Sequence, residues 1–334
     1  MEYRTLGRGG LRVSALCLGA LTFGNETPAR EAARIVARAR AAGVNCIDTS
    51  DVYVDGESER IVGRLIARDR ERWVLATKVG FGPPAPNARG LSRKHIMAAI
   101  DQSLRRLKTD YVDLYYFHVD DQTTPLEEAV RAVGDAIRCG KARYFGVSNI
   151  RSWRLAEVVR LCDQLNVARP IACQPCYNAA TRVAEDEVIP AAAYYGLGVV
   201  PFSPLARGVL TGKYAWGQPP PRQSRAGRHD RRLMMTEWRK ESVAFAAKLA
   251  TRARARGLSA AQFALLWVLA NADVAAAIAG PRTLGQWNEY LAALDHRLSA
   301  ADHAFVDRLV PPGHSTTFGY TDPAYPVIGR TVRS

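Results

Sequence analysis

Short apolar runs alternate along this chain with longer stretches in which apolar residues recur every three or four positions. Runs of that kind predict buried β-strands, and the longer stretches predict amphipathic α-helices. The predicted strands cover residues 15–18, 44–48, 73–78, 112–118, 143–148, 171–175, 197–202 and 274–279. The predicted helices cover residues 28–42, 57–67, 92–107, 125–138, 151–165, 185–195 and 238–270, the last interrupted at Gly257.

The alternation of strand and helix predicts the fold class. A helix between successive strands indicates parallel pairing with right-handed crossovers, which leaves an open doubly wound sheet or a closed barrel. The glycine fingerprint of the dinucleotide-binding open sheet is missing after the first strand. Eight such units without a linker therefore favour an α/β fold, a (β/α)8 TIM barrel.

The rest of the chain is expected to decorate this barrel. Residues 1–13 predict an N-terminal hairpin, and residues 207–240 form a loop long enough to act as a lid. Residues 295–334 predict a C-terminal helix and tail, with the segment 314–325 at the mouth of the pocket. We expect one domain over residues 1–334.

Composition places the chain among ordinary globular proteins, with 48% hydrophobic and 23% charged residues. It contains no apolar run long enough for a membrane span and no secretory signal pattern, so no membrane partner is expected. Six scattered cysteines do not resemble a disulfide framework. These features predict a cytoplasmic protein, with its oligomeric state left open.

The net charge of +14 raises the question of a polyanionic partner. Only seven of the 46 basic residues are lysine, and the basic residues are spread along the chain. Nucleic-acid binding would instead predict a basic stripe with interleaved aromatic residues. We expect a small-molecule partner, no nucleic acid and a modest attraction of anionic ligands.

Four polar residues follow the predicted strands. Asp48, Lys78 and His118 end three strands, and Tyr53 lies a few residues beyond the first of these. In a parallel barrel the carboxyl ends of the strands meet on one face, so the four could share a pocket. An ammonium lowers the pKa of a nearby phenol, a carboxylate holds the ammonium, and a histidine can orient a carbonyl. Taken singly, each is more often a solvated strand end or a packing aromatic. No metal site is expected, because the histidines lack partners at ligand spacing.

The sequence resembles the aldo-keto reductases over about residues 1–294. The stretches that carry the resemblance are 43–53, 56–59, 76–78, 113–118, 140–149, 202–214 and 280–286, together with Gln174 and residues 177–178. The resemblance implies a TIM barrel and NADPH-linked reduction of an aldehyde or ketone. It also implies that Tyr53 donates the proton, Lys78 lowers its pKa, Asp48 pairs with Lys78 and His118 orients the carbonyl.

The same resemblance implies a cofactor site, which we expect the long loop of residues 207–240 to cover. Ser148, Asn149 and Gln174 would hold the nicotinamide carboxamide, and Phe202 would stack on its ring. Further residues at cofactor positions are Ser203, Leu205, Gly208 and Lys213 on the pyrophosphate loop, and Gly280, Arg282, Gln286 and Glu289 near the adenosine.

The cofactor is expected to be NADPH, because the paired donors of Arg282 suit a 2′-phosphate. Tyr290 replaces an asparagine common in the family, which leaves acceptance of NADH open.

Substrate contacts are expected from Phe23, Val54, Phe81 and Val119, which follow predicted strands. Residues 208–214 and the tail look like soil-bacterial reductases of bulky ketones, which suggests a substrate such as a 3-keto trichothecene. The alternative function is a cofactor-binding regulatory module like the potassium-channel β subunits.

Overall fold

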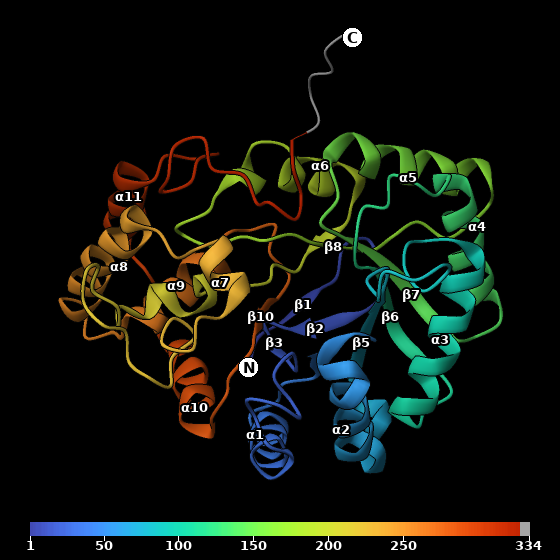
Figure 1. The fold of residues 1–334 in the computed structure, drawn as a ribbon, viewed down its shortest axis with the longest axis horizontal. Helices are drawn as coiled ribbons and strands as arrows, with labels where there is room; N and C mark the ends of the chain where they lie inside the picture. The colour runs from blue at the N-terminus through green and yellow to red at the C-terminus, as the bar shows by residue number, and fades with distance from the viewer. Residues whose placement is uncertain (328–334) are drawn as a thin grey trace, which may run out of the picture.

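The computed structural model describes residues 1–327 and places eight parallel strands at the centre of a ring of helices (Figure 1). The hydrogen-bonded order of the strands is β10-β3-β4-β5-β6-β7-β8-β9. The strands are β3 (Leu16–Gly19), β4 (Cys46–Asp48), β5 (Val74–Val79), β6 (Val112–Phe117), β7 (Ala142–Ser148), β8 (Ala172–Gln174), β9 (Gly198–Val199) and β10 (Ala277–Ala279).

Contacts between the two ends of this order close the sheet. Val199 forms a parallel bridge with Val274, the Ala275 N–H donates to the Val199 carbonyl at 2.8 Å, and β10 pairs with β3 on its other side. The predicted (β/α)8 TIM barrel is therefore confirmed.

The helices that the sequence predicted are present, together with one after the last strand that the apolar spacing did not predict. They are α1 (Ala29–Ala41), α2 (Glu57–Ile66), α3 (Arg93–Leu107), α4 (Leu126–Arg138), α5 (Ser152–Gln164), α6 (Val188–Tyr195), α8 (Lys240–Arg254), α9 (Ala260–Leu269), α10 (Leu284–Ala293) and α11 (Ala300–Leu309). Local sequence explains several ends: Ser259 and Gln262 form a capping box at the start of α9. The main differences are short strands. β9 stops before Pro201, which has no N–H to extend a ladder.

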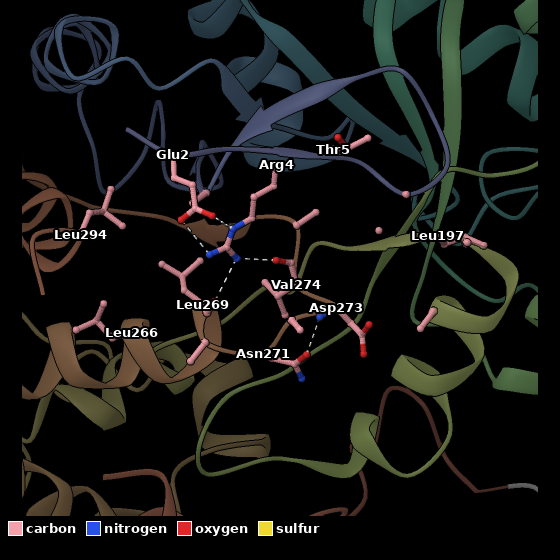
Figure 2. A pocket seen from close by; sticks show the side chains of 18 of the residues that line it. Glu2, Arg4, Thr5, Leu197, Leu266, Leu269, Asn271, Asp273, Val274 and Leu294 are labelled. Atoms are coloured by element: carbon pink, nitrogen blue, oxygen red, sulfur yellow. Dashed lines mark hydrogen bonds and ion pairs between the residues drawn. The ribbon is translucent and has the colours of Figure 1, made fainter. Parts of the chain in front are cut away.

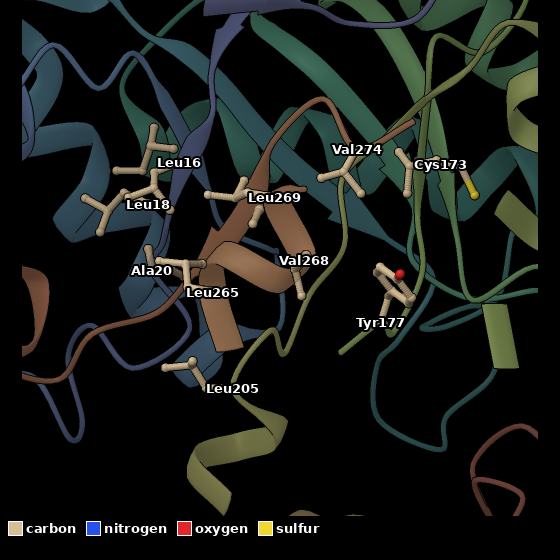
Figure 3. Packing of buried hydrophobic residues seen from close by; sticks show 14 of the residues in the cluster. Leu16, Leu18, Ala20, Cys173, Tyr177, Leu205, Leu265, Val268, Leu269 and Val274 are labelled. Carbon is tan, nitrogen blue, oxygen red and sulfur yellow. The ribbon is translucent and has the colours of Figure 1, made fainter. Parts of the chain in front are cut away.

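Alternate residues of each strand belong to two separate apolar clusters. Cys17, Cys46 and Ala76 face the barrel interior, whereas Leu16, Ile47 and Leu75 face the helices. Figure 3 shows the helix-facing cluster, in which Leu16 and Leu18 lie beside residues of α9. Burial on both sides explains why the strands read as continuous apolar runs.

The predicted N-terminal hairpin is formed by β1 (Tyr3–Thr5) and β2 (Arg12–Ser14), and it covers the amino end of the barrel. Leu6 and Val13 join the interior cluster. Arg4 pairs with Glu2 and donates to the carbonyls of Leu269 and Val274 at 3.1 and 2.8 Å (Figure 2). The hairpin is thus anchored to the end of α9 and the approach to β10.

The long loop after β9 contains a 3₁₀ helix, Ala206–Thr211, and the short helix α7 (Arg231–Met235). Two contacts hold it in place: Arg228 pairs with Glu26 at 2.7 Å, and Arg232 pairs with Asp322 of the C-terminal tail. The tail also lies over Arg239, whose guanidinium stacks on the ring of Tyr320. Part of the predicted tail, residues 328–334, lies outside the described residues.

Candidate active site

The inward-facing residues of the strands end in a polar layer at the carboxyl face. Side chains two positions apart on a strand point to the same face. Asp48, Lys78 and His118 each lie two positions after an interior residue, namely Cys46, Ala76 and Tyr116. Ser148 and Gln174 end β7 and β8 in the same way and are paired in register. The barrel therefore brings together the strand-end residues that the sequence marked.

Lys78 lies at the centre of this layer and is fully buried. Its Nζ donates to Oδ1 of Asp48 at 2.5 Å, to the carbonyl of Thr49 at 2.6 Å and to the hydroxyl of Tyr53 at 3.2 Å. All three donor hydrogens of the ammonium thus have acceptors. Gln174 completes the cluster by donating from Nε2 to Oδ2 of Asp48 at 3.0 Å.

A tight turn carries Tyr53 back over Lys78. The chain after β4 forms a 3₁₀ helix, Tyr53–Gly56, in which Val54 and Asp55 have φ angles of 50° and 51°. This left-handed conformation is rare for a β-branched residue such as valine, and strain of this kind concentrates at functional sites. The turn places the phenol between the buried ammonium and the cavity.

The electrostatics of Lys78 and Tyr53 differ in part from expectation. Burial alone would lower the pKa of Lys78, but the neighbouring Asp48 and Tyr53 reverse this effect and raise that pKa, so the ammonium stays charged. Burial also raises the pKa of Tyr53, and the opposing effect of Lys78 is smaller. Lys78 acts in the predicted direction, yet the net shift is upward because desolvation of the phenolate dominates. Tyr53 therefore holds its proton at neutral pH.

His118 is nearly buried beside this cluster. Burial, and then the charge of Lys78, lower its pKa well below the ordinary value, so its ring is neutral. Phe81 packs edge-on against the ring with centroids 4.7 Å apart, and Tyr53 does so at 5.7 Å. Asn149 donates to the His118 carbonyl at 2.9 Å. The side chain is thus fixed at the cavity wall as an uncharged group.

A cavity of about 660 Å³ opens over these residues. Asp48, Tyr53 and His118 line it, with Lys78 lying beneath them. Other predicted residues that line it are Ser148, Asn149, Gln174, Phe202, Ser203, Leu205, Gly208, Lys213, Gly280, Arg282, Gln286, Val54 and Phe81.

Two predicted substrate residues lie away from this cavity. Phe23 is fully buried in the helix-facing core, because the turn after β3 bonds Gly24 to Thr27 and directs the ring inward. Leu21 and Thr22 line the cavity instead. Val119 packs beside Gly80, where an added Cβ would lie 2.6 Å from Val119 Cγ1. Neither Phe23 nor Val119 therefore lines this cavity.

Glu289 also lies outside the cavity lining. Its Oε1 accepts a hydrogen bond from Ser259 at 2.6 Å, so the carboxylate is held at the start of α9. The neighbouring Tyr290 lines the cavity in its place. Glu289 therefore does not line the cavity with the other residues expected near the adenosine.

Several cavity residues were not singled out from the sequence. Arg207, Arg225, Arg232 and Glu26 all line the cavity, whereas Tyr325, which also lines it, belongs to the tail segment expected at the mouth. The high density of arginine in the long loop could have indicated Arg207, Arg225 and Arg232 from the sequence, whereas no sequence pattern indicated Glu26. Arg207 has a φ of 52° and pairs with Glu237 at 2.9 Å, so it is held by the loop itself.

One end of the cavity is strongly cationic. Lys213, Arg225 and Arg282 line it, and partial burial together with the two arginines lowers the pKa of Lys213. Mutual repulsion of this kind indicates a site built for an anion. Two carboxylates line the cavity beside these cations: Asp230 lies 3.6 Å from Arg225, and Glu26 lies 3.7 Å from Arg282 with a buried Oε2 that has no hydrogen-bond partner among the described residues. A phosphate-bearing ligand fits this donor set.

A second cavity, about 870 Å³ in volume, lies at the opposite end of the barrel (Figure 2). It is larger, but Arg4 of the hairpin is already paired there, and the strand-end cluster is absent from its walls. Within residues 1–327, no three His, Cys, Asp or Glu side chains gather as a metal site. Among the helices of that same range, none is long and apolar enough to cross a bilayer.

Comparison with known proteins gives a family match over nearly the whole chain. The model of the aldo/keto reductase family matches residues 15–311. A probable voltage-gated potassium channel subunit beta from Oryza sativa subsp. japonica is 40% identical over 301 residues, covering 88% of this chain and 92% of that protein. An uncharacterized oxidoreductase, YrpG, from Bacillus subtilis (strain 168) is 36% identical over 334 residues, covering 96% of this chain and 99% of that protein. The chain belongs to the aldo/keto reductase family and is an NAD(P)H-dependent oxidoreductase.

Proposed function

We propose that this protein reduces an aldehyde or ketone to an alcohol with NADPH, and that Tyr53 supplies the proton. The observation that carries the proposal is the position of the Tyr53 hydroxyl. It lies 3.2 Å from the buried ammonium of Lys78 and borders the cavity that also contains the expected nicotinamide residues.

The chain offers free hydrogen-bonding groups for a nicotinamide carboxamide. The amide nitrogen of Asn149 donates to the His118 carbonyl and to Ser148, which leaves its carbonyl oxygen as an acceptor. Gln174 likewise uses Nε2 for Asp48. When bound, NADPH would supply the hydride. Phe202 lines the same cavity as Asn149 and Gln174, which supports its proposed stacking on the nicotinamide ring.

The loop after β9 supports a pyrophosphate site. Ser203, Ala206, Arg207 and Gly208 all have positive φ angles, between 46° and 96°, so the backbone turns sharply beside the cavity. Concave turns of this kind present backbone N–H groups to anions. Lys213 and Arg282 add cationic groups, and Arg282 is the residue proposed to recognise the 2′-phosphate.

The proposed proton donor stabilises negative charge that develops on the substrate oxygen during the reaction. A carbonyl gains negative charge on oxygen as hydride arrives, and a neutral phenol can donate to that oxygen. Lys78 then stabilises the phenolate left on Tyr53, while Asp48 keeps the ammonium charged. His118, neutral and fixed, is placed to orient the carbonyl.

Val54, Phe81 and Tyr325 contribute apolar and aromatic surface to the cavity that Tyr53 borders. Surface of this kind supports a bulky alicyclic ketone, and a 3-keto trichothecene is our candidate of that class.

The six cysteines are free thiols, which supports the proposed cytoplasmic location.

The test is the oxidation of NADPH with a panel of aldehydes and ketones, including a 3-keto trichothecene, by wild type, Tyr53→Phe and the control Tyr194→Phe. Tyr194 is an exposed tyrosine on α6. Loss of a general acid should lower kcat by about 10²-fold or more in Tyr53→Phe and leave NADPH affinity unchanged. Equal turnover of Tyr53→Phe and wild type would remove Tyr53 from the mechanism.

The same panel tests the alternative of a regulatory module, which the name of the Oryza sativa relative suggests. Tight NADPH binding by wild type without turnover of any carbonyl would favour that alternative.

A further inference from the structure

Ser50 lies between two titratable side chains. Its Oγ is 3.0 Å from Oδ1 of Asp51 and 3.1 Å from Nδ1 of His118. Ser50 is fully buried and His118 nearly so. A hydroxyl has one hydrogen to donate, so Ser50 can donate to only one of these neighbours at a time.

The ring of His118 is neutral, and a neutral imidazole carries its hydrogen on one nitrogen only. If Asp51 is ionised, it can only accept, so Ser50 donates to Asp51 and accepts from Nδ1–H of His118. Nε2 of His118 then carries a lone pair. If Asp51 is protonated, it can donate to Ser50, and Ser50 can donate to Nδ1. The ring hydrogen then sits on Nε2.

We propose that Asp51, acting through Ser50, determines which ring nitrogen of His118 carries the hydrogen and thereby whether this histidine donates or accepts a hydrogen bond in the cavity. Asp51 and Ser50 are positioning residues in this scheme, since they act through His118. The sequence analysis assigned no role to Asp51 or Ser50.

Both protonation states of Asp51 are accessible near neutrality. Burial raises its pKa to about 7, while its hydrogen bond with Ser50 acts in the opposite direction. Two charged groups on adjacent helices face it: Glu59 of α2 raises this pKa, and Arg106 of α3 lowers it. Those two pair with each other at 2.6 Å.

Two further titratable groups lie on the strands beside this chain of bonds. The phenol of Tyr115 on β6 is close enough to Asp51 for the carboxylate to raise its pKa, after the larger effect of burial. On the His118 side, burial and then the charge of Lys78 lower the pKa of the ring and keep it neutral, and Tyr53 packs against it. Asp51 is therefore the member of this group whose charge changes in the physiological range.

The consequence for the reaction rests on the proposed function. Nε2–H of His118 can donate to a substrate carbonyl, which suits reduction, whereas the Nε2 lone pair can accept from an alcohol, which suits oxidation. In passing from the first state to the second, Nε2 loses a proton, Nδ1 gains one from Ser50, and Ser50 gains one from Asp51. The net change is one proton released, and Asp51 becomes the carboxylate.

The test is nuclear magnetic resonance of protein carrying ¹⁵N-labelled histidine, without cofactor or substrate, from about pH 5 to about pH 9. The protonated and unprotonated nitrogens of a neutral imidazole resonate far apart, and His118→Asn identifies the signals. We expect Nε2–H at the acidic end and Nδ1–H at the alkaline end. The switch should persist in the control Asp55→Asn, since Asp55 is exposed on the same turn.

Two variants should abolish the switch for different reasons. Asp51→Asn removes the titrating group, and Ser50→Ala breaks the connection, so each should show one tautomer at every pH. The proposal is overturned if the wild-type tautomer does not change with pH, or if the change survives in Asp51→Asn. An inactive protein that shows the switch would contradict the proposed function and leave this inference standing.

Discussion

Gln174 donates a hydrogen bond to Asp48 across the top of the barrel, from Nε2 to Oδ2 at 3.0 Å. The two residues come from opposite parts of the sequence, and one belongs to the proposed nicotinamide site while the other anchors the proton donor. Both are nearly fully buried. The bond therefore joins the two halves of the proposed site.

Replacing Gln174 by leucine should destabilise the protein. Oδ2 of Asp48 would lose this donor in a buried setting, and an unsatisfied buried polar group costs about 1–3 kcal/mol. Urea unfolding followed by tryptophan fluorescence measures the change in the free energy of unfolding. An unchanged midpoint and slope would show that water replaces the amide without cost.

The ion pair of Lys78 and Asp48 should behave as a coupled unit. Lys78→Met leaves a buried carboxylate without its counter-ion, which typically costs about 3–5 kcal/mol. Asp48→Asn alone leaves the ammonium unpaired. We expect the double variant to lose less free energy of unfolding than the sum of the single variants, as measured by urea unfolding. Additive losses would contradict the coupling.

Asp51 should make the stability of the fold depend on pH. Its pKa is about 7 in the folded protein, compared with 3.8 ordinarily, so the folded state binds the proton more tightly than the unfolded state. Its contribution to stability is complete below about pH 4 and is lost as the pH rises through about 7. Asp51→Asn should therefore gain in melting temperature over wild type as the pH rises across this window. Asp55→Asn should track wild type, and an equal effect of both variants would exclude Asp51 as the cause.

Glu26 and Arg282 should affect cofactor choice in opposite directions. Arg282→Ala should weaken binding of NADP⁺ by about tenfold or more and that of NAD⁺ far less, because a hydrogen bond between charged groups contributes about 1.5–3 kcal/mol. Glu26→Gln removes a carboxylate that lies 3.7 Å from Arg282 and should tighten binding of NADP⁺. Calorimetric titration measures both affinities, with the exposed Arg34→Ala as control.

Glu26 also pairs with Arg228 of the covering loop at 2.7 Å. If Glu26→Gln weakens NADP⁺ and NAD⁺ equally, Glu26 acts by holding the loop and does not tune recognition of the 2′-phosphate.

Much of the site could be predicted because it follows from strand periodicity. Asp48, Lys78 and His118 are strand-end residues, and a barrel has only one carboxyl face on which they can meet. The direction of Phe23 was not predictable, since it depends on the hydrogen bonds of a short turn. Contacts between loops far apart in sequence, such as that of Glu26 with Arg228, leave no local pattern. The net pKa of Tyr53 depends on burial, which no sequence motif reports.

The closure of the barrel by β10 has a consequence for folding. β3 finds its second neighbour only when residues 277–279 arrive, more than 250 positions later in the chain. Contacts at such sequence separation are slow to form, because a long loop must close before they contribute. During synthesis β3 is therefore an exposed edge until nearly the whole protein has been made, and such an edge leaves a nascent chain open to aggregation or to a chaperone.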